Sequence, residues 1–165
     1  MLKTAKLFLD ANGRLIRDIL RMRWASDKGL LLLARVISQL IYRRYKCCIS
    51  PTAHVSATVS FPHPVGVVIG DGAVVEDGCV IYQGVTLGRS SRDLTGYPTL
   101  KKNCIVYANA VIAGPIVLQE GTVVGAGAVV TKGSSKENDL LVGVPAKSKF
   151  GRCRIDQNAK EGSLS

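Results

Sequence analysis

The chain has few aromatic residues and few histidines. Aromatic residues make up 5% of its 165 residues, with a single Trp, and there are two histidines. A core must therefore be built from small and branched aliphatic side chains, which belong to the 47% of residues that are hydrophobic. With two histidines, a three-histidine zinc site is impossible without ligands of another type. We therefore expect no metal.

The sequence also lacks a disulfide pattern and a membrane-spanning run. Its five cysteines are odd in number and have no metal-ligand spacing, and two of them, Cys79 and Cys104, fall within apolar repeats, where a free thiol behaves as a small hydrophobe. The longest apolar stretch, 29–42, is interrupted by Arg35 and is too short to cross a bilayer. No signal peptide is evident. These features predict a cytoplasmic protein in a reducing compartment.

Positive charge is concentrated in the N-terminal part. Residues 1–48 hold eleven Lys or Arg and three Asp, a net charge of +8 out of +10 for the chain. Apolar residues recur there at helical spacing in two runs: Leu15, Ile16, Ile19, Leu20 and Leu30, Leu33, Ile37, Leu40, Ile41. We predict a basic segment of two amphipathic helices over 1–48, packed on the body or on a neighbouring subunit. An alternative adds peripheral contact with the inner face of a membrane or an acidic polymer.

The rest of the chain repeats with a period of six residues. An aliphatic residue stands at every sixth position in two series: Ile69, Val75, Ile81, Leu87, then Leu100, Val106, Ile112, Leu118, Val124, Val130. Gly or Asn commonly stands three places later, where a tight turn needs a positive φ. This period fits a triangular coil of three short strands, with coils stacked about 4.8 Å apart. We therefore predict a mainly β protein, a parallel β-helix over 49–150, with a polar tail over 151–165.

The repeat is interrupted twice, and loops on a rigid scaffold often carry function. Residues 88–98 are predicted to leave the coil as a polar loop, and the other interruption contains Pro62-His63-Pro64. His63, held between two prolines, is the leading candidate for proton transfer near neutral pH. The alternative is an exposed or hydrogen-bonded loop histidine. His54 ends a hexad and is expected to be structural or exposed to solvent.

Small residues predict a groove along one edge of the coil. Ala108 precedes Ala126 by eighteen residues, one full coil, so the two should stack on the same edge. They would open a groove for a narrow, extended ligand, and three residues could then meet its phosphates: Thr131, Lys132 and Lys147. Ordinary repeat packing followed by a solvated exit of the chain is the alternative.

Four motifs follow one another in a specific order: 62–70, 81–88, 124–130 and 143–147. Together they resemble the bacterial serine O-acetyltransferase branch of the hexapeptide acyltransferases, over roughly residues 49–150. The resemblance implies a left-handed β-helix, a homotrimer, and acetyl-CoA bound in the groove between adjacent subunits. It places His63 on the catalytic base of the family, and it places the residues of the predicted groove near positions that line the CoA site: Ala108, Ala126, Thr131, Lys132 and Lys147.

Three features depart from that branch. Its members carry Asp before the catalytic His, where this chain has Pro62, and Arg-His-Pro in the protruding loop, where this chain has Gly96-Tyr97-Pro98. Their large N-terminal helical domain is also much reduced here. A zwitterion such as serine needs fixed charge partners, so the departures favour a saccharide hydroxyl, in a surface polysaccharide or its precursor, as the acceptor. The loop would select it through Arg92, Asp93 and Tyr97.

The sequence thus predicts an acetyl-CoA-dependent O-acetyltransferase in which His63 takes the acceptor proton during direct attack on the thioester, without an acyl-enzyme. Two alternatives stay open. One keeps serine as the acceptor, as in cysteine biosynthesis. The other is a non-catalytic trimeric scaffold that binds a membrane or an acidic polymer through its basic helices. No nucleic-acid partner is expected, because the basic segment lacks interleaved aromatics.

Overall fold

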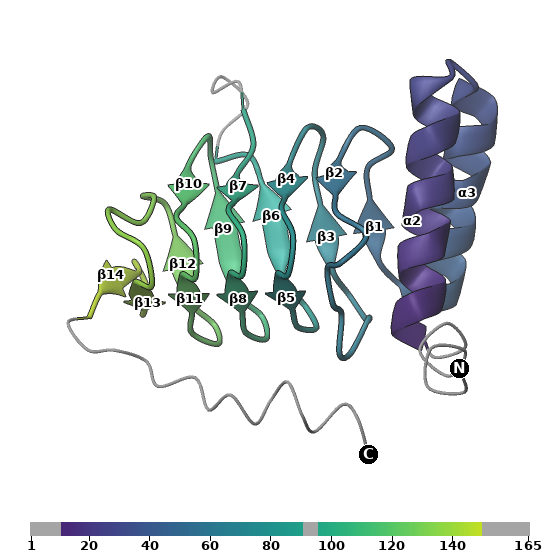
Figure 1. Cartoon of the computed structure of the whole chain (residues 1–165). Helices are drawn as coiled ribbons and strands as arrows, with labels where there is room; N and C mark the ends of the chain where they lie inside the picture. Colours follow the sequence, from purple (N-terminus) through teal and green to yellow (C-terminus); the bar gives the residue numbers. More distant parts are fainter. Residues whose placement is uncertain (1–10, 91–95, 150–165) are drawn as a thin grey trace, which may run out of the picture.

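Short strands wind into a parallel β-helix that two α-helices cover at one end (Figure 1). The computed structural model describes residues 11–90 and 96–149. The helices are α2 (Ala11–Asp27) and α3 (Leu31–Tyr45). The strands are β1 (Cys48–Ile49), β2 (His54–Val55), β3 (Val68–Ile69), β4 (Val74–Val75), β5 (Val80–Ile81), β6 (Thr86–Gly88), β7 (Thr99–Leu100), β8 (Ile105–Val106), β9 (Val111–Ala113), β10 (Val117–Leu118), β11 (Val123–Val124), β12 (Val129–Val130), β13 (Leu140–Val142) and β14 (Lys147–Ser148).

The strands form the three walls of a left-handed β-helix, as the resemblance implied. We call them sheet A (β1-β3-β6-β9-β12), sheet B (β2-β4-β7-β10) and sheet C (β5-β8-β11-β13-β14). Within each sheet, neighbouring coils pair in parallel, for example Val123 opposite Ile105 and Val129 opposite Val111. Residues eighteen positions apart therefore lie on adjacent coils, wherever no loop intervenes.

One aliphatic residue from each hexad fills the interior of the coil. All ten members of the predicted series are at most 1% exposed: Ile69, Val75, Ile81, Leu87, Leu100, Val106, Ile112, Leu118, Val124 and Val130. Small or branched residues at the corners are buried as well, including Ala73, Cys79 and Ala110. Burial of these stacked side chains stabilises the coil through the hydrophobic effect. Because one residue of each hexad points inward, the sequence has an aliphatic residue at every sixth position.

The corners between sheets C and A show why Gly and Asn recur in the repeat. Gly84 has a φ of +68° and Asn109, on the next coil, a φ of +59°. A Cβ at Gly84 would collide with the Asn109 side chain. Only a residue without a side chain fits there, so the identities of these two turn residues are linked across neighbouring coils.

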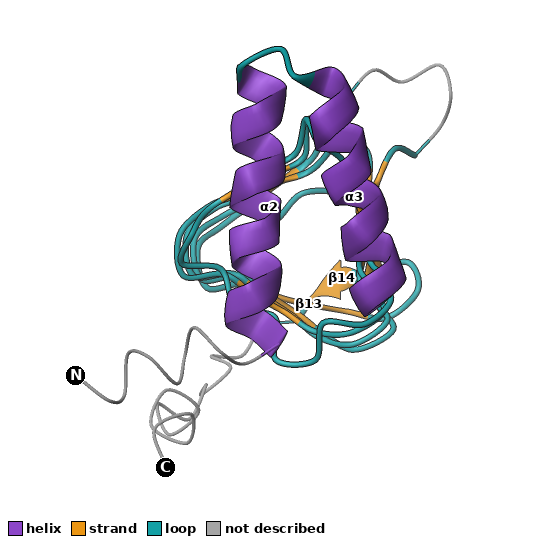
Figure 2. Ribbon diagram, turned by 90° about the vertical axis from the view of Figure 1, so that its right-hand side faces the viewer, coloured by secondary structure: helices purple, strands orange, loops and turns teal. Residues whose placement is uncertain are grey.

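The two helices lie side by side across the first coil (Figure 2). They bury one face of each helix: Leu15, Ile16, Ile19, Met22 and Ala25 from α2, and Ala34, Ile41 and Tyr45 from α3. Asn12 of α2 accepts a hydrogen bond from the backbone N–H of Phe61 at 2.9 Å, and the Ser38 hydroxyl of α3 donates to the Ile49 carbonyl at 3.2 Å. The helices are thus fixed to the coil beside His63.

The opposite end of the coil is covered by the chain itself. After β13 the backbone reverses, and β14 pairs antiparallel with β13, with Val142 opposite Lys147. The connecting segment crosses sheet A, where Val129 donates to the Gly143 carbonyl at 3.0 Å and Ala146 donates to the Val129 carbonyl at 2.8 Å. None of the helices among the described residues has the length and apolar character needed to cross a bilayer.

Candidate active site

His63 lies in the first turn of a column of corners between sheets C and A. We call this column the His63 corner; it comprises residues 62–66, 82–84, 107–109 and 125–127 of four successive coils. Pro64 is buried while His63 is exposed, and the Val65 N–H donates to the His63 carbonyl at 2.8 Å. The turn therefore anchors the backbone at one proline and presents the imidazole at the surface.

Two tyrosines continue from His63 along the same corner. The ring of Tyr82 lies 6.3 Å from the imidazole, centroid to centroid, at an interplanar angle of 53°. Tyr82 in turn stacks on Tyr107 of the next coil at 5.1 Å and 22°. Among the described residues, no carboxylate hydrogen-bonds the imidazole, in keeping with Pro62 standing before it. Its nearest described support is therefore the aromatic ring of Tyr82.

Ala108 and Ala126 stack at the same corner, as their spacing predicts. Their coils are joined by a hydrogen bond from the Gly127 N–H to the Ala108 carbonyl at 2.9 Å, and a similar bond joins the Asn109 N–H to the Gln83 carbonyl. The corner is thus lined with tyrosines beside His63 and with methyl groups farther along the coil. Such a strip is narrow and mostly apolar, which suits an extended ligand.

Of the three other predicted CoA contacts, two lie at another corner, and Lys147 lies beside the last coil of the His63 corner, because its strand partner Val142 packs against Gly125. Thr131 and Lys132 follow β12, at the corner between sheets A and B, and both are exposed. Lys147 is the first residue of β14, beside β13, and is also exposed. A single copy therefore does not gather Thr131 and Lys132 with the two alanines into one groove.

The predicted acceptor loop leaves the corner between sheets A and B, after β6 and before β7. Arg92 and Asp93 lie outside the described residues. Tyr97 is half-buried, and its ring covers Gly70, where an added Cβ would collide with it. The guanidinium of Arg89 lies 5.7 Å from the centre of the same ring. In one copy of the chain, then, the base of the loop and His63 sit at different corners of the triangle.

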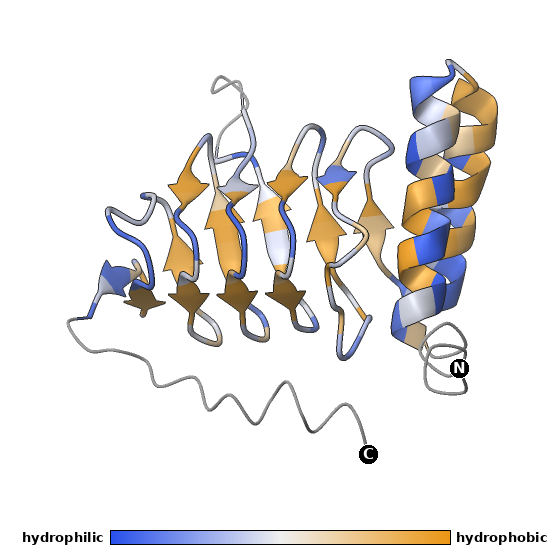
Figure 3. Ribbon diagram, in the orientation of Figure 1, coloured by the Kyte–Doolittle hydropathy of each residue, from blue (hydrophilic) through white to orange (hydrophobic). Residues whose placement is uncertain are grey.

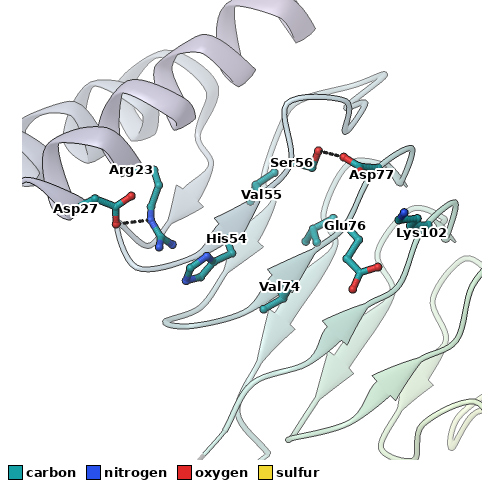
Figure 4. Close-up of a pocket in the computed structure, with 10 residues that line it drawn as sticks. Arg23, Asp27, His54, Val55, Ser56, Val74, Glu76, Asp77 and Lys102 are labelled. Atoms are coloured by element: carbon teal, nitrogen blue, oxygen red, sulfur yellow. Dashed lines mark hydrogen bonds and ion pairs between the residues drawn. The ribbon is translucent and has the colours of Figure 1, made fainter.

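His54 belongs to another hollow, on sheet B beside α2 (Figure 4). This cavity of about 540 Å³ is also lined by charged residues of both signs, among them Arg23, Glu76 and Asp77. They have partners within the chain: Arg23 pairs with Asp27 at 2.8 Å, Glu76 pairs with Lys101 at 2.8 Å, and Asp77 accepts from Ser56 and Thr58. The charges of Arg23, Glu76 and Asp77 are therefore each satisfied by another residue of the chain.

Three residues of this corner, Tyr82, Tyr107 and Gln83, are not among the site residues predicted from the sequence. Aligning the hexads across the 88–98 loop brings Tyr82 opposite Tyr107, because Ile81 pairs with Val106, so a signal was present. Gln83 is a different case, since its amide oxygen is buried without a hydrogen-bond partner among the described residues. A buried acceptor of this kind is normally satisfied by water or by a ligand, and nothing in the spacing of the repeat reveals it.

Three of the four cysteines among the described residues are shielded from an acyl group, and the fourth, Cys48, is exposed on β1 of sheet A. Cys79 and Cys104 are fully buried inside the coil, and Cys47 is fully buried under α3. Burial raises the pKa of the Cys47 thiol, and the neighbouring Cys79 together with burial raises the pKa of Cys104. Both thiols are thereby kept protonated and unreactive. The described residues contain no cluster of three or more His, Cys, Asp or Glu that could hold a metal ion.

Comparison with known proteins supplies the family. Residues 97–132 match the family model "Bacterial transferase hexapeptide (six repeats)". The chain is 38% identical over 127 residues to a serine acetyltransferase of Mycobacterium tuberculosis, covering 75% of this chain and 54% of that protein. It is 35% identical over 125 residues to a serine acetyltransferase of Synechococcus elongatus, covering 75% of this chain and 51% of that protein. The chain thus spans about half the length of the curated relatives it matches.

Solved structures that resemble this chain are also serine acetyltransferases. The crystal structure of serine acetyltransferase from Vibrio cholerae superimposes with a TM-score of 0.82 and 29% identity, over 90% of this chain and 57% of that chain. A serine acetyltransferase in complex with CoA superimposes with a TM-score of 0.76 and 27% identity, over 82% of this chain and 55% of that chain. The shared part includes the coil and reaches into the helices.

These findings correct one prediction. The interpretation that the acceptor is a saccharide is wrong, because the relatives and the structural neighbours are serine acetyltransferases. The prediction treated two departures from the family, at Pro62 and at Gly96-Tyr97-Pro98, as the loss of every residue that could pair with the charges of serine. The same loop still carries a cation and an anion, Arg92 and Asp93, so the exchange of one dipeptide does not remove both charges.

Proposed function

Because the chain is a hexapeptide-repeat protein of the bacterial transferase family, we propose that it transfers the acetyl group of acetyl-CoA to the hydroxyl of L-serine. The observation that supports this most strongly is the position of His63. It is an exposed imidazole, held by a buried proline at the head of a narrow corner, in a chain whose relatives are serine acetyltransferases. Its free thiols suit a reducing compartment, so we place the reaction in the cytoplasm.

In the proposed reaction His63 acts as a general base. It accepts the hydroxyl proton while the serine oxygen attacks the thioester carbonyl, forming a C–O bond and a tetrahedral oxyanion. When the intermediate collapses, the C–S bond breaks and the imidazolium returns its proton to the CoA sulfur. The transfer is direct, because the cysteines near this end of the coil are buried and protonated or lie away from His63.

The donor site requires more than one copy of the chain. Ala108 and Ala126 lie on the His63 corner and Lys147 lies beside its last coil, whereas Thr131 and Lys132 lie at the corner between sheets A and B. A trimer in which these parts of one copy face the His63 corner of the next would bring all five residues to one groove. The methyl groups would then line the pantetheine arm, and the lysines would meet the phosphates of CoA.

The acceptor site also combines two copies. The loop of a neighbouring copy would approach His63, and its Arg92 and Asp93 would pair with the carboxylate and the ammonium of serine. Tyr97 supports that loop from below, because its ring is packed over Gly70. If the loop of one copy serves the His63 of another, the base of the loop and His63 need not lie at the same corner within one copy.

The experiment is a measurement of CoA thiol release from acetyl-CoA by the purified full chain. We expect release that depends on L-serine and falls to background with O-methylserine, in which the attacking hydroxyl is blocked. D-Serine tests whether the site distinguishes the arrangement of the ammonium, the carboxylate and the hydroxymethyl group around Cα. Release of the same size without any acceptor, or absence of release while CoA still binds, would contradict the proposal.

A further inference from the structure

The outward face of α3 is apolar. Leu32, Val36 and Leu40 follow one another at intervals of four residues and are 79%, 49% and 54% exposed, and Leu31 beside them is 59% exposed. The opposite face of the helix is buried through Ala34, Ile41 and Tyr45. In a helix on a protein surface the outward side is normally polar. Here both sides carry apolar residues, and the visible side of α3 is coloured as hydrophobic over much of its upper half in Figure 3.

The apolar stripe is flanked by cations without partners among the described residues. A hollow of about 300 Å³ is lined by Arg35, Val36, Gln39, Leu40 and Arg43. The ion pairs on the helices are made by Arg21, Arg23 and Arg44, with Asp18 and Asp27. Arg35 and Arg43 take part in none of them. The hollow therefore combines an apolar floor with two unpaired guanidinium groups.

The charge of both helices has the same sign. Residues 11–46 hold nine Lys or Arg and two Asp, a net charge of +7, and α3 itself contains no acidic residue. Two copies meeting through this face would bring Arg35 and Arg43 of one copy against those of the other, which is unfavourable. An anionic surface, by contrast, complements both the charge and the apolar stripe.

We propose that this face of α3, formed by Leu31, Leu32, Arg35, Val36, Leu40 and Arg43, docks on an anionic phospholipid bilayer. The helix lies in the plane of the interface, with its leucines and valine at the boundary of the acyl chains and its two arginines on lipid phosphates. Since α2 and α3 cover the first coil, the docking face lies on the side of α3 that points away from the coil (Figure 2). The proposal is independent of the proposed activity, because it requires no turnover.

The test is cosedimentation of the full chain with vesicles of phosphatidylcholine, with and without phosphatidylglycerol. Binding is expected only to the vesicles that contain phosphatidylglycerol, and it should weaken when the salt is raised from about 0.1 M to about 0.5 M. Each basic side chain near an anionic surface strengthens binding about fivefold. The double variant Arg35→Gln/Arg43→Gln should therefore bind roughly 25-fold more weakly.

Two further variants separate the docking face from general charge. Lys102→Gln/Lys136→Gln removes the same charge from exposed sites on the coil and should leave binding unchanged. Leu32→Gln/Val36→Gln/Leu40→Gln keeps every charge and should abolish the binding that persists at high salt. All substituted side chains are exposed, and circular dichroism checks that the variants fold.

Three results would overturn the proposal. Equal loss of binding in the coil variant would mean that net charge alone attracts the lipid. Equal binding to both kinds of vesicle would exclude an anionic partner. A larger assembly on light scattering that the triple glutamine variant dissociates, together with no vesicle binding by the parent chain, would mean that a second copy covers this face.

Discussion

The imidazole of His63 faces the ring of Tyr82 across 6.3 Å, and Tyr82 in turn stacks on Tyr107. The histidine that the sequence singles out for proton transfer is therefore supported by an aromatic pair from the next two coils. In this place a histidine base often has a carboxylate that orients its ring. The chain has Pro62 before His63, and the described residues contain no such carboxylate at the imidazole.

Replacing His63 by Asn should remove the general base. We expect kcat for serine acetylation to fall about 10²- to 10⁴-fold, while the binding of CoA and the far-ultraviolet circular dichroism remain unchanged, because His63 is exposed. His54→Asn is the matched control, since His54 lies on sheet B beside α2. Equal losses in both variants, or full activity in His63→Asn, would show that His63 is not the base.

Tyr82 is expected to act on the position of His63. Tyr82→Phe keeps the ring and should retain most of the activity, whereas Tyr82→Ala leaves the imidazole without its neighbour and should lower kcat about tenfold with little change in the KM for acetyl-CoA. Steady-state kinetics with both substrates varied would test this. A similar loss in Tyr82→Phe would instead assign a role to the phenol hydroxyl.

Substitutions at Gly84 and Gly72 can separate the cost of backbone strain at positive φ from the cost of a steric clash with the next coil. Both have φ near +70°, but a Cβ at Gly84 would meet Asn109, whereas a Cβ at Gly72 would have nothing within 4 Å. Gly72→Ala should therefore lower the free energy of unfolding by about 1–2 kcal/mol, and Gly84→Ala by about 2–4 kcal/mol.

The double variant Gly84→Ala/Asn109→Gly should recover the difference, because glycine tolerates the φ of +59° at position 109. Urea unfolding measures all three values. If Gly84→Ala cost no more than Gly72→Ala, the contact between neighbouring coils would not constrain this corner.

The stability of the coil should depend on Asp77 in acid. Hydrogen bonds from the hydroxyls of Ser56 and Thr58 hold the pKa of this carboxyl below its usual value. A lowered pKa in the folded state gives stability above the unfolded value of about 3.9, and this stability is lost as the pH falls through the folded value. The unfolding free energy at pH 7 and below pH 3 should therefore differ more in the parent chain than in Asp77→Asn.

Glu137→Gln controls for the loss of one negative charge, because Glu137 is exposed. It should leave the pH dependence close to that of the parent chain. An equal flattening of the pH dependence in both variants would assign the effect to net charge, and the hydroxyls of Ser56 and Thr58 would then contribute nothing specific.

The repeat made most of the fold predictable. Each interior position is set by a single requirement, an aliphatic side chain every sixth residue, so Ile81 and Val106 were identified without any long-range information. The helices followed from their apolar spacing in the same way. Left-handed winding is not encoded in the period, and it came from the family resemblance.

The candidate site was less predictable from the sequence, because it depends on which corners of the coil lie close together, within one copy and between copies. His63 stands out by its prolines, and Ala108 and Ala126 by a spacing of one coil. The stacking of Tyr82 on Tyr107 can be predicted only after the hexads are aligned across the loop inserted between their coils. In the proposed trimer, residues such as Thr131 and Lys132 would reach this groove from another copy of the chain, and the sequence of one copy cannot show how two copies face each other.

The reversal at the end of the coil has a consequence for polymerisation. A stack of parallel coils leaves open backbone groups on its last coil, and another molecule could add to them as the next rung of a fibre. Here α2 and α3 cover the first coil, and the segment from Gly143 to Ser148 covers sheets A and C of the last coil, with β14 running antiparallel to its neighbour β13. Because an antiparallel strand cannot be extended in register by another parallel coil, the chain limits the length of its own solenoid.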